Sequence, residues 1–297
     1  LDEVRFWSFL ENTQKEELAK LKKQSDWKLK ILDRFDRMVK KYGIVRLLRK
    51  GLEVDDANFT LFYQLPLASS SAQVKQNFES NEFSVTRQLR YSLANPGEEI
   101  DMVLFVNGIP FSTMELKNHW TGQNAKVHAL HQYRFKRDNT QPLLSFGRCL
   151  VHFAVDTDEV YMTTKLSGAD TFFLPFNLGH NFGKGNPPNP AGHKTSYLWE
   201  EILTRQSVAN IFQHFVRFDG KESDPLAKKN LYFPRYHQLD VVRKLIQHSS
   251  HHGVGQTYLI QHSAGSGKSN SITWAAYQLI ETYPNAENTP LTPDFSH

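Results

Sequence analysis

Two acidic side chains and one lysine near residue 100 are of types that could carry out hydrolysis at phosphorus. Asp101 lies inside the apolar run IDMVLF, and Glu115 and Lys117 lie in the segment MELKN. Phosphodiester hydrolysis uses a divalent ion that polarises the phosphate and lowers the pKa of an attacking water. Magnesium prefers oxygen ligands, usually one or two carboxylates. A neighbouring lysine can orient the nucleophile or offset charge on the phosphate.

A β-hairpin must bring these three side chains together. Residues i and i+2 of a strand share a face, so Glu115 and Lys117 point the same way and Leu116 points into the core. A two-residue turn at residues 107–108 would place Asp101 opposite Met114, facing away from Glu115. A three-residue loop at residues 106–108, with Gly108 in a G1 bulge, shifts the register by one. The site therefore predicts that bulge or an equivalent register shift.

The same residues have a plainer interpretation. A glutamate and a lysine two positions apart on an edge strand are commonly only the polar face of that strand. An acid inside an apolar run is rarer, because a buried carboxylate is costly unless it is paired or bound to a metal. Asp101 therefore favours a functional site over a polar strand face.

A second group of residues has the pattern of a phosphate-binding loop. Residues 264–269 read AGSGKS, after a β-rich segment at 257–261 and before an apolar helical pattern. Backbone N–H groups of such a loop hold anionic oxygens. We expect Gly265, Ser266 and Gly267 to form the cradle, with Lys268 reaching the β- and γ-phosphates of ATP and Ser269 binding magnesium. His262 stands where the strict pattern has glycine.

Hydrophobic periodicity predicts an α/β protein around these groups. Helical spacing covers residues 1–24, 28–42 and 236–248, and a further helix runs from the turn at 121–122 to about residue 136. Strands are expected at 58–65, 100–106, 111–117, 149–155, 160–165 and 257–261. Residues 184–193 form a Gly/Pro-rich loop, and the polar residues 283–297 are expected to be a disordered tail.

Composition narrows the class of protein. The 297 residues are 39% hydrophobic and 22% charged, with a net charge of +4, as in ordinary soluble domains. No apolar run approaches the roughly 20 residues of a membrane span. The start Leu1-Asp2-Glu3 has no signal-peptide pattern and no initiator Met, so we expect a fragment of a cytoplasmic protein. Cys149 is the only cysteine, which excludes an internal disulfide and a thiolate zinc site.

The segments around the first group resemble a known family. Asp101 followed by Glu115-Leu116-Lys117 looks like the PD-(D/E)XK nuclease motif. The stretches EEIDMVLFVNGIPFSTMELKN, VHFAVDTDEVYMTTKL and TFFLPFNLG resemble the N-terminal region of the restriction (R) subunit of type I restriction-modification enzymes. The resemblance runs from about residue 75 to about residue 280. It implies that Asp101 and Glu115 bind magnesium and that Lys117 assists cleavage of DNA.

Other residues receive roles through the same resemblance. Many such nucleases carry a Gln-x-x-x-Tyr element on the next helix; Tyr133 matches its tyrosine, Ala129 replaces its glutamine, and the neighbouring Gln132 could substitute. A half-buried helix aromatic is the alternative interpretation of Tyr133. AGSGKS resembles motif I of superfamily 2 helicases, and PRYHQ resembles their adenine-binding element, which would assign Gln238 to adenine. The basic residues 126, 134, 136 and 137 could contact DNA phosphates.

The resemblance implies a fold, an activity and partners. Residues 1–220 would be a PD-(D/E)XK endonuclease domain with N-terminal helices and a central mixed sheet flanked by helices. Residues 221–297 would begin a RecA-like ATPase/translocase domain, truncated before its acidic motif and therefore unable to hydrolyse ATP alone. Double-stranded DNA and the methyltransferase (M) and specificity (S) subunits would be partners, and Mg²⁺ and ATP cofactors. Two alternatives stay open: a nucleotide-binding motor fragment whose hairpin acids are structural, and a non-catalytic docking piece.

Overall fold

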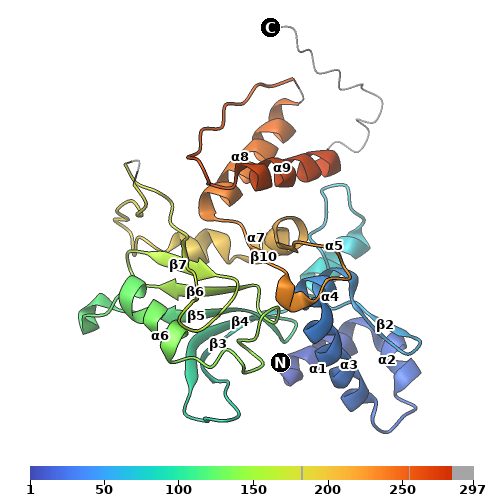
Figure 1. Cartoon of the computed structure of the whole chain (residues 1–297). Helices are drawn as coiled ribbons and strands as arrows, with labels where there is room; N and C mark the ends of the chain where they lie inside the picture. The colour runs from blue at the N-terminus through green and yellow to red at the C-terminus, as the bar shows by residue number, and fades with distance from the viewer. Residues whose placement is uncertain (182, 254, 283–297) are drawn as a thin grey trace. The chain divides into compact units, whose positions relative to one another are not determined.

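A mixed β-sheet with helices on both faces forms the centre of the first of two units in the chain. The structure is a computed structural model and describes residues 1–181, 183–253 and 255–282 (Figure 1). The chain divides into two compact units, Leu1–Phe233 and Pro234–His297. None of the helices in these described ranges is long and apolar enough to cross a lipid bilayer.

Four helices and a small hairpin begin the first unit, and the helices within residues 1–24 and 28–42 are those that the sequence predicts. The four helices are α1 (Glu3–Thr13), α2 (Lys15–Leu21), α3 (Trp27–Tyr42) and α4 (Ile44–Lys50), followed by β1 (Leu52–Val54) and β2 (Ala57–Phe59). The side chain of Asp2 caps α1 by accepting a hydrogen bond from the Arg5 amide. The strand predicted at 58–65 is wrong beyond Phe59, where β2 ends against its only partner, β1.

The central sheet has six strands in the order β3-β4-β5-β6-β7-β8. The strands β5 and β6 are parallel, and every other neighbouring pair is antiparallel. The predicted mixed sheet is therefore confirmed. Its strands are β3 (Phe83–Arg90), β4 (Glu99–Val106), β5 (Ile109–Leu116), β6 (Val151–Val155), β7 (Val160–Thr163) and β8 (Leu174–Pro175).

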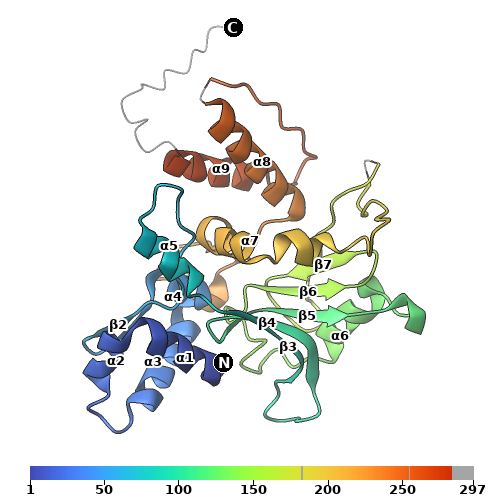
Figure 2. The ribbon, with the colours of Figure 1, turned by 180° about the vertical axis from the view of Figure 1, so that it is seen from behind.

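The parallel strands β5 and β6 must be joined by a crossover connection. This crossover carries the helix that covers one face of the sheet. The crossover contains η1 (His119–Thr121), η2 (Ala125–Ala129) and α6 (Leu130–Phe135). Ala129 and Tyr133 of this segment pack in one buried cluster with Val103 of β4 and Ala154 of β6. The segment η3 (Leu198–Ile202), α7 (Arg205–Asn210) and η4 (Ile211–Phe215) lies on the opposite face, as the front and back views show (Figures 1 and 2).

Short elements complete the first unit. The helix α5 (Ala72–Glu79) precedes β3, and η5 (Leu226–Lys228) lies between the paired strands β9 (Arg217–Phe218) and β10 (Leu231–Tyr232). Because β10 pairs with β9, residues up to 232 belong with the first unit.

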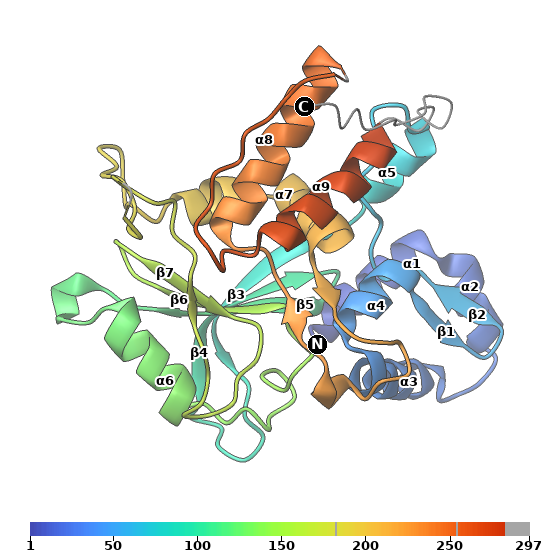
Figure 3. The same cartoon turned by 45° about the horizontal axis from the view of Figure 1, so that its top comes forward.

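The second unit consists of two helices that pack side by side, α8 (Tyr236–His252) and α9 (Lys268–Thr282) (Figure 3). Both helices are predicted correctly, but the strand predicted at 257–261 is wrong. Leu259 is 93% exposed, and no strand pairs with this segment within the described residues. A β-rich sequence forms a strand only when a neighbour accepts its backbone hydrogen bonds. The tail predicted at 283–297 lies outside the described residues.

Candidate active site

The β4–β5 hairpin carries the register shift that the site requires. Val106 pairs with Ile109 across a two-residue turn, and both turn residues, Asn107 and Gly108, have positive φ, as in a type I′ turn. The predicted three-residue loop is therefore wrong. The register shifts further along instead, because Phe105 pairs with Pro110 whereas Leu104 pairs with Ser112.

Phe111 is an extra residue of β5 that has no opposite residue in β4, so it forms a β-bulge. Beyond this bulge Met102 pairs with Met114, and the continued register places Asp101 across from Glu115. Directly opposite residues of an antiparallel pair lie on one face. The predicted register shift is thus confirmed, and the bulge brings the two carboxylates to the same face of the sheet.

Asp101 lies at the accessible side of this group. Its Oδ2 accepts a hydrogen bond of 2.7 Å from the Leu116 amide and lies 3.8 Å from Nζ of Lys117. The Asp101 side chain is about one-third exposed, and the Lys117 side chain is 11% exposed. Leu116 is 38% exposed and does not enter the core, contrary to the prediction. The Asp101 carboxylate is therefore positioned by the Leu116 amide and the Lys117 ammonium while it remains accessible to solvent.

Glu115 is completely buried on the same face. Its Oε1 accepts a hydrogen bond of 2.6 Å from Nε of Arg137, and its buried Oε2 has no partner. Burial raises the pKa of Glu115 to about 7; the Arg137 guanidinium opposes this shift and the nearby Asp101 carboxylate adds to it. A buried carboxylate with one unoccupied oxygen is well suited to ligate a cation.

The contact of Arg137 with Glu115 is not predicted by the sequence, which indicates only a contact of this basic side chain with DNA phosphate. The Arg137 side chain is 8% exposed and lies beyond the end of α6. Arg137 follows Tyr133 by four residues, so helical spacing could have placed both side chains over the same strands.

Tyr133 lies in a buried chain of polar groups below the carboxylates. Its hydroxyl is 2.8 Å from the Thr113 hydroxyl, which is 2.7 Å from Nδ1 of His152. Thr113 and Glu115 both face α6, so Tyr133 lies close to Glu115. Burial is the largest cause of the raised pKa of Tyr133, and the charge of Glu115 is the second. Ala129 is buried one turn earlier, and Gln132 is half-buried at a neighbouring helical position.

The residues predicted to bind a nucleotide lie in the second unit. Gly265 and Gly267 have positive φ, Ser266 is buried, and Lys268 begins α9 with its Nζ donating to the carbonyl of His262. Ser269 occupies the first turn of α9. The expected turn and helix start are therefore formed.

Gln238 holds this loop from the start of α8. Its Nε2 donates to the carbonyls of Ser266 and Gly267, and its Oε1 accepts from the amide of Arg235. A Cβ added to Gly267 would lie 2.3 Å from the Gln238 amide nitrogen, so only glycine permits this contact. The Gln238 amide thus contacts the loop itself.

Comparison with known proteins places this hairpin in a described family. The model of the type I restriction enzyme R protein N terminus matches residues 6–171, more than half of the chain, a range within which Asp101, Glu115 and Lys117 lie. The chain belongs to this R-protein family.

Two relatives of the R-protein family match beyond that segment. A protein of Methanocaldococcus jannaschii, described as the MjaVIIIP type I restriction enzyme endonuclease subunit, is 23% identical over 220 residues, 71% of the chain. The HindI type I restriction enzyme endonuclease subunit of Haemophilus influenzae is 23% identical over 247 residues, 82% of the chain. The alignments cover 20% and 23% of these relatives, so the chain spans about a fifth of their length.

A second acidic group occurs near the first in this R-protein chain. Ligand atoms of His119, Asp156 and Asp158 lie within 4.8 Å of one another. Asp156 is already used by the backbone, because it accepts hydrogen bonds from the amides of Ala125, Asp158 and Glu159. Asp158 pairs with Lys194. These contacts identify a capped turn after β6.

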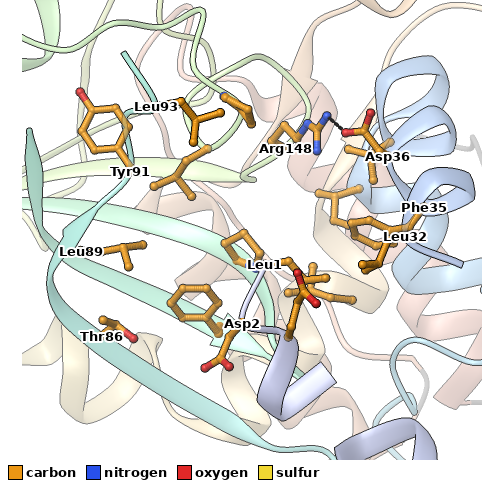
Figure 4. Close-up of a pocket in the computed structure, with 18 of the residues that line it drawn as sticks. Leu1, Asp2, Leu32, Phe35, Asp36, Thr86, Leu89, Tyr91, Leu93 and Arg148 are labelled. Carbon is orange, nitrogen blue, oxygen red and sulfur yellow. Dashed lines mark hydrogen bonds and ion pairs between the residues drawn. The ribbon is translucent and has the colours of Figure 1, made fainter. Parts of the chain in front are cut away.

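A pocket of about 540 Å³ opens elsewhere in the R-protein fold, between α3 and the strands β3 and β4. Leu32 and Phe35 line one side, and Leu89 and Tyr91 line the other (Figure 4). Arg148 and Asp36, which form an ion pair, are among its charged lining residues. Because neither Asp101 nor Glu115 lines it, this pocket is separate from the carboxylate site.

Proposed function

We propose that residues 1–220 are the magnesium-dependent DNA endonuclease region of a type I restriction enzyme R subunit. The observation that carries the proposal is the Phe111 bulge, because it places Asp101 on the same face as Glu115. Membership in the R-protein family and the endonuclease-subunit names of two relatives support it. The acids and the lysine fit the order of the PD-(D/E)XK motif.

The donor set suits a hard cation. Asp101 and Glu115 offer carboxylate oxygens, which magnesium prefers as ligands. Oε2 of Glu115 is buried and has no hydrogen-bond partner. Magnesium held there would polarise a DNA phosphate and lower the pKa of an attacking water. The two carboxylates are therefore the proposed metal ligands.

The remaining side chains have supporting roles in this proposal. Lys117 is tethered near Asp101, where its ammonium can orient the attacking water or offset charge on the phosphate. Tyr133 and Thr113 are hydrogen-bonded to each other on the face of the sheet that carries Glu115, where they can limit movement of its side chain. Asp101 itself is fixed by the Leu116 amide, so its position does not depend on substrate.

Replacement of Glu115 tests this function. We expect Glu115→Ala to abolish magnesium-dependent nicking of supercoiled plasmid, because one of two metal ligands is removed, with circular dichroism unchanged. Glu99→Ala is the matched control, since Glu99 lies on β4 two residues before Asp101 and pairs with Arg90 at the surface. Nicking by Glu115→Ala at the unmodified rate would reject the proposed site.

Two other interpretations of the hairpin make a different forecast. The Glu115–Arg137 ion pair is an observation that favours a purely structural role for the acids, either in a motor fragment or in a docking piece. In that case the unmodified chain would bind no divalent ion at these carboxylates and would not nick DNA in the presence of magnesium.

We propose that residues 221–297 contain the start of a RecA-like superfamily 2 translocase domain that binds ATP, and that this domain begins at Pro234, because residues up to Phe233 belong to the first unit. Gly265, Ser266 and Gly267 would cradle phosphates, Lys268 would contact the terminal phosphates, and Ser269 would bind magnesium. Gln238 holds the loop at its base, so any contact with adenine would require its amide to leave the loop. This chain alone is not expected to hydrolyse ATP, because no acidic motif follows Lys268 in the sequence.

Partners of the full protein follow from this proposal. We expect the region to act on double-stranded DNA and to work beside methyltransferase and specificity subunits, which would select the site. Lys126 of η2, Arg134 of α6 and Lys136 directly after α6 are basic residues of the crossover that also carries Tyr133. These side chains can contribute sequence-independent contacts to DNA phosphates.

A further inference from the structure

Arg137 and Glu115 form an ion pair at the centre of the carboxylate site. Their side chains are 8% and 0% exposed, and Nε of Arg137 lies 2.6 Å from Oε1 of Glu115. The guanidinium therefore occupies one of the two oxygens that a metal ion would use. The other oxygen, Oε2, is buried and has no hydrogen-bond partner.

When Glu115 is ionised, the charges of the four neighbouring groups cancel. Asp101 and Glu115 are balanced by Lys117, at 3.8 Å from Asp101, and by Arg137. A divalent cation that entered beside Lys117 and Arg137 would meet two positive charges in a partly buried space, where repulsion is screened little by solvent. Separating one of these side chains from its carboxylate would favour binding of the cation.

We propose, on the basis of the nuclease assignment above, that Arg137 is a positioning residue that couples metal binding at Glu115 to the arrival of DNA. Without DNA it pairs with Glu115 and disfavours the metal. With DNA it pairs with a phosphate of the bound strand and releases Oε1 to the metal. The guanidinium remains paired in both states, so neither state leaves a buried charge alone.

Both the chemistry and the position of Arg137 suit this exchange. The planar fork of a guanidinium matches carboxylate and phosphate oxygens equally well. Arg137 lies two residues after Phe135, the last residue of α6. The Arg137 side chain can therefore turn from Glu115 to a phosphate without unwinding α6. Asp101, the other carboxylate, stays in place through its bond to the Leu116 amide.

Calcium binding measured by calorimetry on the whole chain, without DNA, tests the exchange. Calcium takes oxygen ligands. We expect Arg137→Gln to bind Ca²⁺ at least tenfold more tightly than the unmodified chain, because the competing cation is gone. Arg148→Gln is the matched control, because Arg148 is also a largely buried arginine but pairs with Asp36 and not with Glu115. This control should leave the Ca²⁺ affinity within about twofold.

A merely structural Arg137 predicts the opposite result. If Arg137 only keeps the site assembled, Arg137→Gln will bind Ca²⁺ as the unmodified chain does or more weakly, and the proposal is overturned. If Arg137→Gln does not fold, Arg137→Lys decides alone, since an ammonium pairs less well with a carboxylate. It should bind Ca²⁺ at least threefold more tightly, and equal or weaker binding overturns the proposal.

Glu115→Gln separates this inference from the proposed function. Loss of Ca²⁺ binding in Glu115→Gln, with no gain in Arg137→Gln, would reject the exchange and leave the nuclease assignment standing. Ca²⁺ binding by Glu115→Gln equal to that of the unmodified chain would reject the metal site, and the exchange with it.

Discussion

The two carboxylates of the hairpin have different surroundings, although they lie on one face. Asp101 is part-exposed and is held by the Leu116 amide and Lys117, whereas Glu115 is buried and its pKa is raised to about 7, chiefly by burial. Identity and spacing predicted the pair, but not this asymmetry. It arises because Tyr133 and Arg137 cover Glu115. Both residues belong to the β5–β6 crossover, and the local sequence pattern does not predict how that crossover packs on the sheet.

The histidine below the site predicts how stability depends on pH. Burial lowers the pKa of His152 to about 3. Between that value and about 6.5, the ordinary value for histidine, the unfolded chain holds the proton and the folded chain does not. The free energy of unfolding therefore falls as the pH drops from about 6.5 towards 3, by about 1.4 kcal/mol per pH unit from this residue alone.

Urea unfolding at pH 7.5 and pH 5.0 measures this effect. We expect His152→Gln to reduce the difference between the two free energies by about 2 kcal/mol, from the unit values above. The exposed His193 is the control, and His193→Gln should leave the difference unchanged. A difference equal in His152→Gln and the unmodified chain would show that the pKa of His152 is the same in the folded and unfolded chains, contrary to this prediction.

At the scale of elements, the β4–β5 hairpin decides whether a site exists. The alternating pattern and the Asn-Gly dipeptide predicted two antiparallel strands and a shift between them, but the shift was assigned to the turn. It lies instead at Phe111, directly after Pro110. Proline has no N–H to donate to the ladder, so irregular pairing beside it is favoured. Pro110 was the signal in the sequence that could have located the bulge.

Asn107 fixes this hairpin in the fold, and its replacement gives a prediction. Its side chain is fully buried, accepts from the Glu82 amide and donates to the carbonyl of Leu61 and to Asn81. Its φ of 51° is tolerated by asparagine better than by alanine. We expect Asn107→Ala to lower the free energy of unfolding by about 3 kcal/mol, through unsatisfied buried groups and backbone strain.

Chemical denaturation of Asn107→Ala provides the measurement. Asn58→Ala is the control, because Asn58 lies exposed in β2 and only its backbone amide bonds to Glu17. That variant should change stability by less than about 0.5 kcal/mol. A loss of similar size in both variants would mean that the turn is not the anchor described above.

At the scale of the whole molecule, the two candidate sites are built from separate units. The carboxylate site uses residues between 101 and 152, and the phosphate loop uses residues between 235 and 269. Local patterns predicted the helices of both units. They failed for residues 257–261, because a strand depends on a neighbour that local sequence does not report.

This separation predicts independent responses. We expect Lys268→Ala to weaken binding of a fluorescent ATP analogue at least tenfold, through loss of a phosphate contact, and to leave magnesium-dependent nicking unchanged. Glu115→Ala should do the reverse. Lys244→Ala, at an exposed pair with Asp240 on α8, controls for loss of charge. Nicking lost in Lys268→Ala, or robust ATP hydrolysis by this chain, would contradict the account.

The most direct test of the central claim is the position of a bound metal ion. Crystals of the chain with duplex DNA and Mn²⁺ would be measured for anomalous scattering. The account predicts a strong peak between Asp101 and Glu115, at about 2.2 Å from a carboxylate oxygen of each, a typical distance for oxygen ligands. Manganese bound only elsewhere, for example at His119 and Asp158, with the two hairpin carboxylates free of metal, would contradict it.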